Sequence, residues 1–255
     1  MIWKLLMIFS LYNSLNIEKH FSSDIFFNLD YSELLKTIKR QIIRYSQKEG
    51  EPIFILGLSG GIDSAVVAYL IRYSLGPEKL LTLNLPYFRT DNGINRARMV
   101  SSQLGNQHFE ISIKELVDQK ITLLNSHYHK KYRIKKNSLV VSERNRIGNL
   151  ASRLRINIFY DFARTYNARV LGTANKVELI LGYATKWGTP FSFDYGILND
   201  FYKYHIQKFA EILKVPSKII NAKPSTGFYL DQSHEKEIGV NLFLLELYKL
   251  NIKKM

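Results

Sequence analysis

The chain of 255 residues contains no cysteine. A disulfide framework, a thiolate zinc site and a cysteine nucleophile are therefore excluded, and the composition fits a reducing compartment such as the cytoplasm. The sequence also has no internal repeat and no low-complexity tract. Because 46% of the residues are hydrophobic, we expect a real core, organised as one α/β domain or two small ones.

Acidic residues are also few. Aspartate and glutamate total 22 against 36 lysines and arginines, which gives a net charge of +14. Such an excess favours anionic partners, namely nucleotides, nucleic acid or an acidic membrane surface. Much of it lies in stretches rich in lysine, isoleucine and asparagine, and these also fit a biased genome composition. Charge alone therefore does not identify a partner.

Long hydrophobic runs are missing as well. The most apolar stretch, Met1–Leu15, is too short to span a bilayer. It also lacks a good cleavage site for a secretory signal, since Ser10 and Ser14 are the only small residues nearby. We therefore expect no membrane association and treat residues 1–28 as an N-terminal extension or packing segment.

Apolar strands alternate with amphipathic segments along most of the chain. A capping pattern at Asp30 predicts a helix that ends near Gly50. We expect strands over 53–58, 80–85, 108–113 and 170–172. Helices are expected over 65–75, 92–104, 116–124, 149–166, 178–183, 201–213 and 237–250, and loops over 126–136, 187–199 and 219–232. This alternation predicts an α/β fold with a doubly wound, mostly parallel sheet flanked by helices.

The first predicted strand ends in a burst of glycine and serine that fits two chemistries. Residues 57–61 match G-x-S-x-G, the turn that presents a nucleophilic serine in hydrolases. Partners for such a serine exist in Asp194 with His205 or His234. However, Ser59 follows the first good strand, whereas that hydrolase fold places its serine after several strands. The hydrolase interpretation is therefore disfavoured.

A phosphate-binding loop fits the same residues better. Glycines let backbone N–H groups approach an anion, and the following helix directs its positive end to the same place. Ser59 and Ser64 add hydroxyl groups, and Asp63 is placed to hold Mg²⁺ on a polyphosphate. No Gly-Lys-Ser/Thr follows, so the loop is not a Walker P-loop. A simple glycine-rich helix cap remains the alternative.

Several motifs together resemble a known family. Residues 59–64 resemble the S-G-G-x-D-S loop of the ATP pyrophosphatases, which split ATP between its α- and β-phosphates. Residues 148–156 resemble the G-N-x-x-A-R-x-R-M segment of ammonia-dependent NAD synthetase, with Ser152 and Ile156 in place of alanine and methionine. Further matches are G-T-x-N-K-x-E at 172–178, G-Y-x-T-K-x-G at 182–188, D-L-Y-K at 200–203 and a late P-[ST] turn at 224–225.

The resemblance implies a fold and a set of site residues. It implies one domain over residues 29–255, of the Rossmann-like adenine nucleotide alpha hydrolase type. ATP would be bound by Gly57, Leu58, Ser59, Gly60, Gly61, Ile62, Asp63, Ser64, Thr173, Lys203 and Ser225. Asp63 and Glu178 would be the catalytic carboxylates that hold Mg²⁺. Arg153, Lys186 and Asp194 would contact deamido-NAD. The simpler alternatives are a helix cap for Asp63, a solvated helix face for Glu178 and a surface ion pair for Arg153.

The reaction implied by the resemblance has two steps. The carboxylate of deamido-NAD attacks the α-phosphate of ATP, pyrophosphate leaves, and ammonia then displaces AMP from the acyl-adenylate. The chain has no cysteine for a glutaminase, so free ammonia or a separate donor is implied. The resemblance also implies a homodimer. Two other classes stay open, namely an adenylating enzyme that acts on another carboxylate or on tRNA, and a degenerate copy without activity.

One segment departs from the family's pattern. After T-K-x-G the family continues with an acid and a glycine, whereas this chain has Thr189 and Pro190. An acid there could orient or deprotonate ammonium, but a threonine can only form hydrogen bonds. We therefore expect intact ATP and Mg²⁺ binding, with an amidation step that is slowed or redirected.

Overall fold

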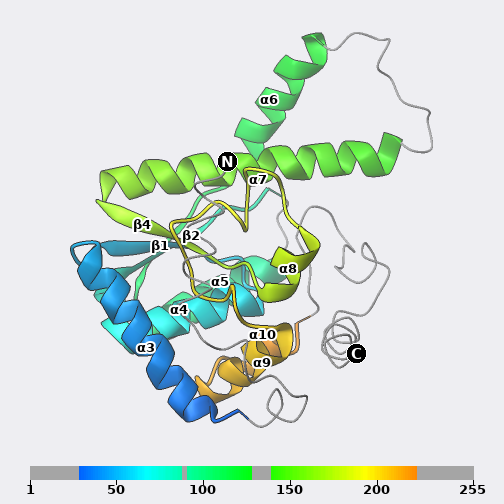
Figure 1. The fold of residues 1–255 in the computed structure, drawn as a ribbon. Coiled ribbons are helices and arrows are strands. Elements are labelled where there is room, and N and C mark those ends of the chain that lie inside the picture. Colours follow the sequence, from blue (N-terminus) through cyan, green and yellow to red (C-terminus); the bar gives the residue numbers. More distant parts are fainter. Residues whose placement is uncertain (1–28, 88–90, 128–138, 223–255) are drawn as a thin grey trace.

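The computed structural model describes residues 29–87, 91–127 and 139–222. Its centre is a five-stranded parallel sheet in the order β3-β2-β1-β4-β5 (Figure 1). The strands are β1 (Ile53–Gly57), β2 (Leu80–Asn84), β3 (Gln107–Glu110), β4 (Ala168–Gly172) and β5 (Tyr195–Gly196). Strand β1 pairs in parallel with both β2 and β4, so the chain winds outward from β1 in two directions.

Helices lie on both faces of this sheet (Figure 1). They are α3 (Tyr31–Lys48), α4 (Ile62–Leu75), the short η2 (Pro77–Lys79), α5 (Asp91–Leu104), α6 (Lys114–His127), α7 (Leu139–Thr165), α8 (Lys176–Leu181), α9 (Lys203–Ile212) and α10 (Ser217–Ile220). None of these helices is both long enough and apolar enough to cross a membrane, a finding that covers only the described residues.

The alternation of side chains along β1 divides the core into two layers. Phe54 and Leu56 are fully buried against α3, α4, α5 and α9. Ile55 points to the opposite face and is fully buried against α7 and the first turns of α6. A strand that is apolar on both faces is typical of the centre of a doubly wound sheet. The predicted α/β fold with a doubly wound parallel sheet is therefore confirmed.

The predicted start of the first described helix is also confirmed. The Asp30 carboxylate accepts hydrogen bonds from the backbone N–H groups of Ser32 and Glu33, at 3.0 and 3.1 Å. This cap satisfies two of the donors that a helix leaves unpaired at its start. Helix α3 then buries Leu35, Ile38 and Ile42, the residues that its apolar spacing selects.

Other boundaries differ from the predicted ones. Helix α7 begins at Leu139, ten residues before the predicted start at Asn149. Its first turns carry arginine, glutamate and Gly148, so the apolar period is weak there, and an ion pair between Arg146 and Glu143 at 2.5 Å supports the helix instead. Strand β5 lies in the predicted loop over 187–199, and helix α10 begins just before the predicted loop over 219–232 and extends into it. Elements of two to four residues give no periodic signal. The predicted helix over 237–250 lies outside the described residues.

Candidate active site

The glycine-rich loop lies at the carboxyl edge of the sheet. Residues 57–64 connect the end of β1 to the first turn of α4, beside the point where the strand order reverses between β1 and β4. Open parallel sheets bind their ligands in the crevice at such a switch point. The order of the strands therefore puts the loop where a nucleotide site is expected.

Two serines hold the loop in its conformation. The Ser59 and Ser64 hydroxyl groups are hydrogen-bonded to each other at 3.1 Å, and the Ser64 hydroxyl also donates to the Gly61 carbonyl at 3.0 Å. Gly61 is the N-cap of α4, and no side chain of the described residues caps that helix. The first backbone N–H groups of α4 are thus available to an anion, as in other phosphate loops.

Close packing makes glycine necessary at position 60. Gly60 has φ +80°, and a Cβ there would lie 2.3 Å from the Gly93 carbonyl oxygen of α5. The Arg96 Nε, one turn further along α5, donates to the Gly60 carbonyl at 2.8 Å. Helix α5 therefore fixes the loop through the Gly60 backbone carbonyl, and this contact uses no N–H group of the loop.

Two carboxylates and one lysine from distant segments meet beside this loop. Asp63 is in the first turn of α4, Glu178 is in α8 and Lys203 begins α9. The Lys203 ammonium donates to Asp63 Oδ2 at 2.5 Å. Both side chains are 20% exposed, so this ion pair is partly shielded from water. The local fold thus brings three of the predicted site residues together.

Glu178 lies in an unfavourable position for a negative charge. Burial and the nearby negative charge of Asp63 raise its pKa from 4.5 to about 7, although Lys203 and the Asn175 N–H act in the opposite direction. Its Oε2 accepts from the Asn175 backbone N–H at 3.1 Å, while the Asn175 side chain accepts from the Glu178 N–H. Asn175 and Glu178 thus form the cap of α8. The helix cap considered as an alternative for Asp63 is not made, since α4 begins after its N-cap Gly61 without a side-chain cap among the described residues.

These carboxylates fit a Mg²⁺ ion. Asp63 Oδ1 is buried and has no hydrogen-bond partner among the described residues. Such an oxygen is costly unless a cation or a water reaches it. Within the described part of the chain, no group of three or more His, Asp or Glu side chains could hold a metal on its own. Mg²⁺ commonly takes one or two carboxylates and completes its shell with waters and phosphates, which matches this pair.

The remaining residues predicted to bind ATP lie in the loop, at the edge of the sheet or outside the described residues. Thr173 follows the last residue of β4 and therefore lies at the same edge of the sheet as the loop. Ser225 lies outside the described residues. The loop residues Gly57 and Leu58 are fixed by neighbours: a Cβ on Gly57 would lie 2.6 Å from the Phe159 ring, and the Leu58 carbonyl accepts from the Asn84 side chain at 2.6 Å.

The three residues predicted to contact deamido-NAD are divided between two places. Arg153 of α7 donates through Nε to the Lys186 carbonyl at 3.0 Å, so these two lie together. Asp194 instead accepts from the Val170 N–H at 2.8 Å and from the Tyr160 hydroxyl at 3.1 Å. Both of its carboxylate oxygens are thus used in joining β4 to α7, which is a structural task.

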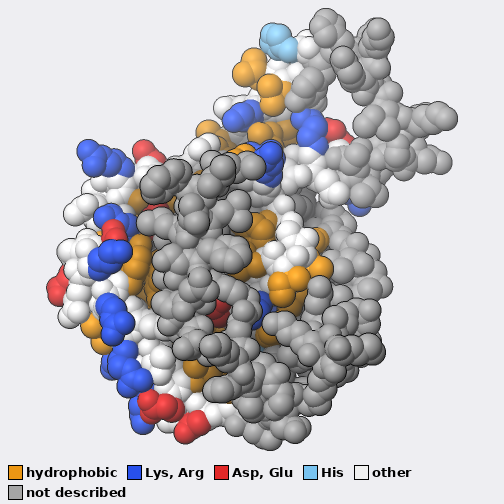
Figure 2. Space-filling model, viewed as in Figure 1, with side chains coloured by type: hydrophobic (Ala, Val, Ile, Leu, Met, Phe, Trp, Pro, Cys, Tyr) orange, Lys and Arg blue, Asp and Glu red, His pale blue; other side chains and the backbone are white. Residues whose placement is uncertain are grey.

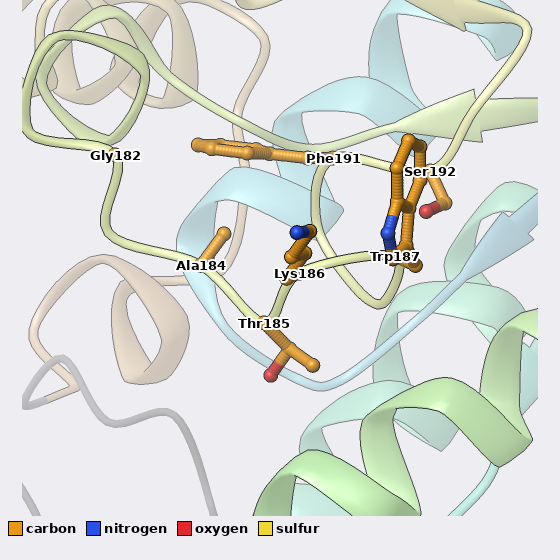
Figure 3. Close-up of a pocket in the computed structure, with 7 residues that line it drawn as sticks. All are labelled: Gly182, Ala184, Thr185, Lys186, Trp187, Phe191 and Ser192. Atoms are coloured by element: carbon orange, nitrogen blue, oxygen red, sulfur yellow. The ribbon is translucent and has the colours of Figure 1, made fainter.

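A pocket of about 330 Å³ lies beside Lys186 (Figure 3). Its lining consists of Gly182, Ala184, Thr185, Lys186, Trp187, Phe191 and Ser192. Trp187 is 64% exposed, although large aromatic side chains are usually covered. The pocket thus combines two aromatic rings with one cation, a set that fits an anionic ring compound.

Sequence reasoning missed the residues that hold this segment. Asn149 accepts from the Thr185 hydroxyl at 2.6 Å, and Ser152 bonds to Thr189. Arg155 was also missed; its Nε donates to the Leu85 carbonyl at 2.9 Å, and burial lowers its pKa to about 10. Each contact joins residues more than 30 positions apart, so only their place within a matched motif pointed to them.

The alternative hydrolase site does not assemble in the described residues. The Ser59 hydroxyl contacts Ser64 and Gly61, whereas His205 lies among aromatic rings and accepts through Nδ1 from the Tyr202 N–H at 3.2 Å. Asp194 is occupied as described, and His234 lies outside the described residues. The loop after β1 is therefore built for an anion and not for a nucleophilic serine.

Comparisons with known proteins agree with this geometry. A family model described as NAD synthase matches residues 34–253. An NH(3)-dependent NAD(+) synthetase of Thermococcus kodakarensis is 36% identical over 229 residues, which cover 89% of this chain and 84% of that protein. The structure of an NMN synthetase from Francisella tularensis is similar with a TM-score of 0.69 and 29% identity, over 82% of both chains.

A second solved structure, an NH3-dependent NAD synthetase of Campylobacter jejuni, has a TM-score of 0.64 and 28% identity, over 75% of this chain and 77% of that one. The family model thus covers most of the chain, and it includes the phosphate loop, both carboxylates and the segment around Lys186. The chain belongs to the NAD synthase family.

Proposed function

We propose that this protein is a ligase that amidates deamido-NAD to NAD with ammonia and ATP. The carboxylate of deamido-NAD attacks the α-phosphate of ATP, so that an acyl–phosphate bond forms and pyrophosphate leaves. Ammonia then attacks the acyl carbon, AMP leaves and one proton is released. The observation that carries this proposal is the Asp63–Lys203 pair beside a glycine-rich loop, in a chain of the NAD synthase family.

Each part of the site has a task in the first step. The N–H groups of the first turn of α4, at residues 62–64, would bind the leaving pyrophosphate, and Lys203 adds a positive charge beside Asp63. An anion must attack a polyanion in this step, so charge neutralisation is the main requirement. Asp63 and Glu178 would hold Mg²⁺, which when bound neutralises phosphate charge. Thr173 and Ser225 complete the proposed ATP site.

The proposed site for the acyl substrate lies at Lys186. The Lys186 ammonium and the Arg153 guanidinium supply positive charge that would bind a carboxylate or a diphosphate, and Trp187 offers a ring for stacking. Asp194 would contribute indirectly, by holding β4 to α7. We further propose a single catalytic unit over residues 29–255, a homodimer, the use of free ammonia, and a place in the cytoplasm, where ATP is available.

A decisive test follows both half-reactions in one mixture. The protein is incubated with Mg-ATP, deamido-NAD and ammonium, and pyrophosphate and NAD are measured separately. Formation of both at about 1 per second or faster supports the proposal and shows that Thr189 does not hinder amidation. Pyrophosphate without NAD contradicts the proposed amidation to NAD and supports the expectation of a changed second step. If neither pyrophosphate nor NAD forms, the proposal is contradicted. Another carboxylate substrate or an inactive copy is then favoured.

A second candidate substrate is suggested by the similarity to an NMN synthetase structure. The same chemistry would then amidate the mononucleotide that carries a nicotinate carboxylate, without the adenylate half of deamido-NAD. Comparison of kcat/KM for the two substrates decides between them. We expect deamido-NAD to be preferred, since two relatives of higher identity, at 36% and 37%, are named as NAD synthetases.

A nucleic-acid substrate would need a basic surface. Lysine and arginine side chains follow α3 on the face seen in Figure 2, but Glu33 already pairs with Lys36 and Arg40 there. A tRNA shift assay at two salt concentrations tests this alternative. We expect no shift that survives physiological salt.

Substitution of Arg153 tests the proposed acyl site. Arg153→Ala removes a cation and the bond to the Lys186 carbonyl, so we expect the KM for deamido-NAD to rise about tenfold and the KM for ATP to stay unchanged. Arg164→Ala, in the last turn of the same helix, is the control. Equal changes in both KM values would remove Arg153 from the acyl site.

A further inference from the structure

The segment that carries Lys186 is held by one face of helix α7. Asn149, Ser152 and Arg153 are spaced three and four positions apart, so their side chains leave the helix on the same side. Asn149 bonds to Thr185 and Arg153 bonds to the Lys186 carbonyl. Both of these contacts lie before Trp187 in the chain.

Ser152 makes the contacts that lie after Trp187. Its hydroxyl accepts from the Thr189 backbone N–H at 2.9 Å and is hydrogen-bonded to the Thr189 hydroxyl at 2.9 Å. The Ser152 side chain is fully buried, so water does not compete for these bonds. The Thr189 hydroxyl therefore turns toward α7, and Thr189 is absent from the pocket lining.

Between these anchors the backbone is strained. Trp187 has φ +61°, a left-handed conformation that bulky residues rarely adopt. The next residue, Gly188, closes a turn by donating to the Thr185 carbonyl at 2.9 Å. A Cβ on Gly188 would lie 2.6 Å from the Ser152 hydroxyl, so the turn and the helix are in close contact. A strained turn persists only when its surroundings fix it from both sides.

We propose that Ser152 is a positioning residue for the acyl-substrate site. Its buried hydroxyl fixes the backbone at Thr189 and thereby keeps Trp187 and Lys186 where they line the pocket (Figure 3). This inference rests on the proposed function, because it assigns the pocket to the acyl substrate. Ser152 and Thr189 are also two of the positions at which the chain departs from the family's motifs, and the structure joins them.

The main test is Ser152→Ala, measured with both substrates. We expect the KM for deamido-NAD to rise about tenfold, because small displacements of a binding group are costly, while the KM for ATP stays within about twofold. The matched control is Ser101→Ala in α5, a buried serine that also donates to a loop carbonyl, that of Asn106 at 3.3 Å. It should lower the melting temperature comparably without separating the two KM values. Equal KM changes in Ser152→Ala, or the same separation in Ser101→Ala, would overturn the inference.

Two further variants approach the same contact differently. Thr189→Val keeps the N–H bond to Ser152 but loses the hydroxyl contact, so its effect should be smaller and not additive with Ser152→Ala. Gly188→Ala leaves Ser152 in place but pushes against its hydroxyl, and we expect it to reproduce the KM separation. Additive effects of Ser152 and Thr189 would show that the two side chains act independently.

A spectroscopic readout tests the position of the turn without turnover. The chain has two tryptophans, so Trp3→Phe leaves Trp187 as the sole indole fluorophore. In that background we expect Ser152→Ala to increase the quenching of Trp187 by acrylamide and to lower its anisotropy, and Ser101→Ala to change neither. Unchanged Trp187 signals would overturn the inference even if the wild-type protein makes NAD. If the wild-type protein makes no NAD, the proposed function fails, while this measurement still decides whether Ser152 holds the turn.

Discussion

At the scale of single residues, Asp63 combines a satisfied and an unsatisfied oxygen. Oδ2 accepts from Lys203, whereas the buried Oδ1 has no partner among the described residues. In an ordinary structural ion pair both carboxylate oxygens would have hydrogen-bond donors, because an unpaired buried acceptor costs stability. The residue is thus arranged to receive a cation on one side while the lysine remains on the other.

We expect Asp63→Asn to reduce Mg²⁺-dependent pyrophosphate release by about 100-fold or more, since a charged oxygen at the phosphates is lost. The melting temperature should change by only a few degrees, because the asparagine keeps the shape of the side chain. Glu211→Gln is the control, as it removes a carboxylate from the exposed Lys208 pair at 2.9 Å. Wild-type pyrophosphate release in Asp63→Asn would contradict the assignment.

Glu178 makes the stability of the metal-free protein depend on pH. Its pKa is raised from 4.5 to about 7, so the folded state binds this proton more tightly than the unfolded chain does. The contribution of this residue to stability is therefore present below pH 4.5 and is lost as the pH rises toward 7. Glu178→Gln removes the titration and can still accept from the Asn175 N–H.

We accordingly expect the melting temperatures of wild type and Glu178→Gln, measured in EDTA, to differ more as the pH rises. Wild type and Glu178→Gln should be similar near pH 5, and the variant should melt a few degrees higher near pH 8. The measurement is differential scanning fluorimetry from pH 5 to 8 without nucleotide. Parallel curves for the two proteins over this range would show that Glu178 does not titrate there.

At the scale of elements, the phosphate loop depends on its contact with α5. Gly60→Ala would place a Cβ 2.3 Å from the Gly93 carbonyl oxygen, and φ +80° is strained for alanine. Gly50 has φ +79° but nothing within 4 Å of its Cβ position, so Gly50→Ala isolates the cost of the backbone conformation, about 1 kcal/mol.

From this comparison we expect Gly50→Ala to lose about 1 kcal/mol of unfolding free energy and no affinity for ATP. Gly60→Ala should lose more stability and should raise the Kd for ATP at least about tenfold, because the loop must move away from α5. Urea denaturation and calorimetric titration measure the two quantities. Equal effects of the two alanines would mean that the contact with Gly93 is unimportant.

The elements also show what the sequence could predict. The cap at Asp30 and the doubly wound parallel sheet depend on local patterns and on the rule that parallel strands are joined by helices, so both were predictable, whereas the order of the strands was not predicted. The Asp63–Lys203 and Ser152–Thr189 contacts join residues 140 and 37 positions apart. Such pairings depend on how helices pack on the sheet, and one sequence contains no periodic signal for them.

At the scale of the whole molecule, α7 lies along the body and α6 projects away from it beyond α7 (Figure 1). Leu116 and Leu123 are 50% and 62% exposed, and their spacing of seven puts them on one face of α6. Exposed apolar residues on a projecting helix favour a contact with another chain. They therefore suit the homodimer that we propose.

We expect sedimentation equilibrium to show a dimer of the 29.7 kDa chain. Leu123→Lys should weaken the dimer about tenfold or more by placing a charge on an apolar contact. Ile212→Lys, at a 47% exposed position at the end of α9, is the control and should leave the dimer intact. A monomeric wild type, or a Leu123→Lys variant with an unchanged dimer constant, would exclude this face of α6.

The position of β1 in the sheet has a consequence for the order in which the protein is made. Its neighbour β2 follows closely in the chain, whereas β4 pairs with it across more than a hundred residues. A growing chain that has left the ribosome up to α6 therefore holds the phosphate loop on an incomplete sheet, open along one edge. Lys203, which balances the charge of Asp63, is synthesised later still. Competence to bind nucleotide thus appears late in synthesis, only when the two halves of the chain have met around β1.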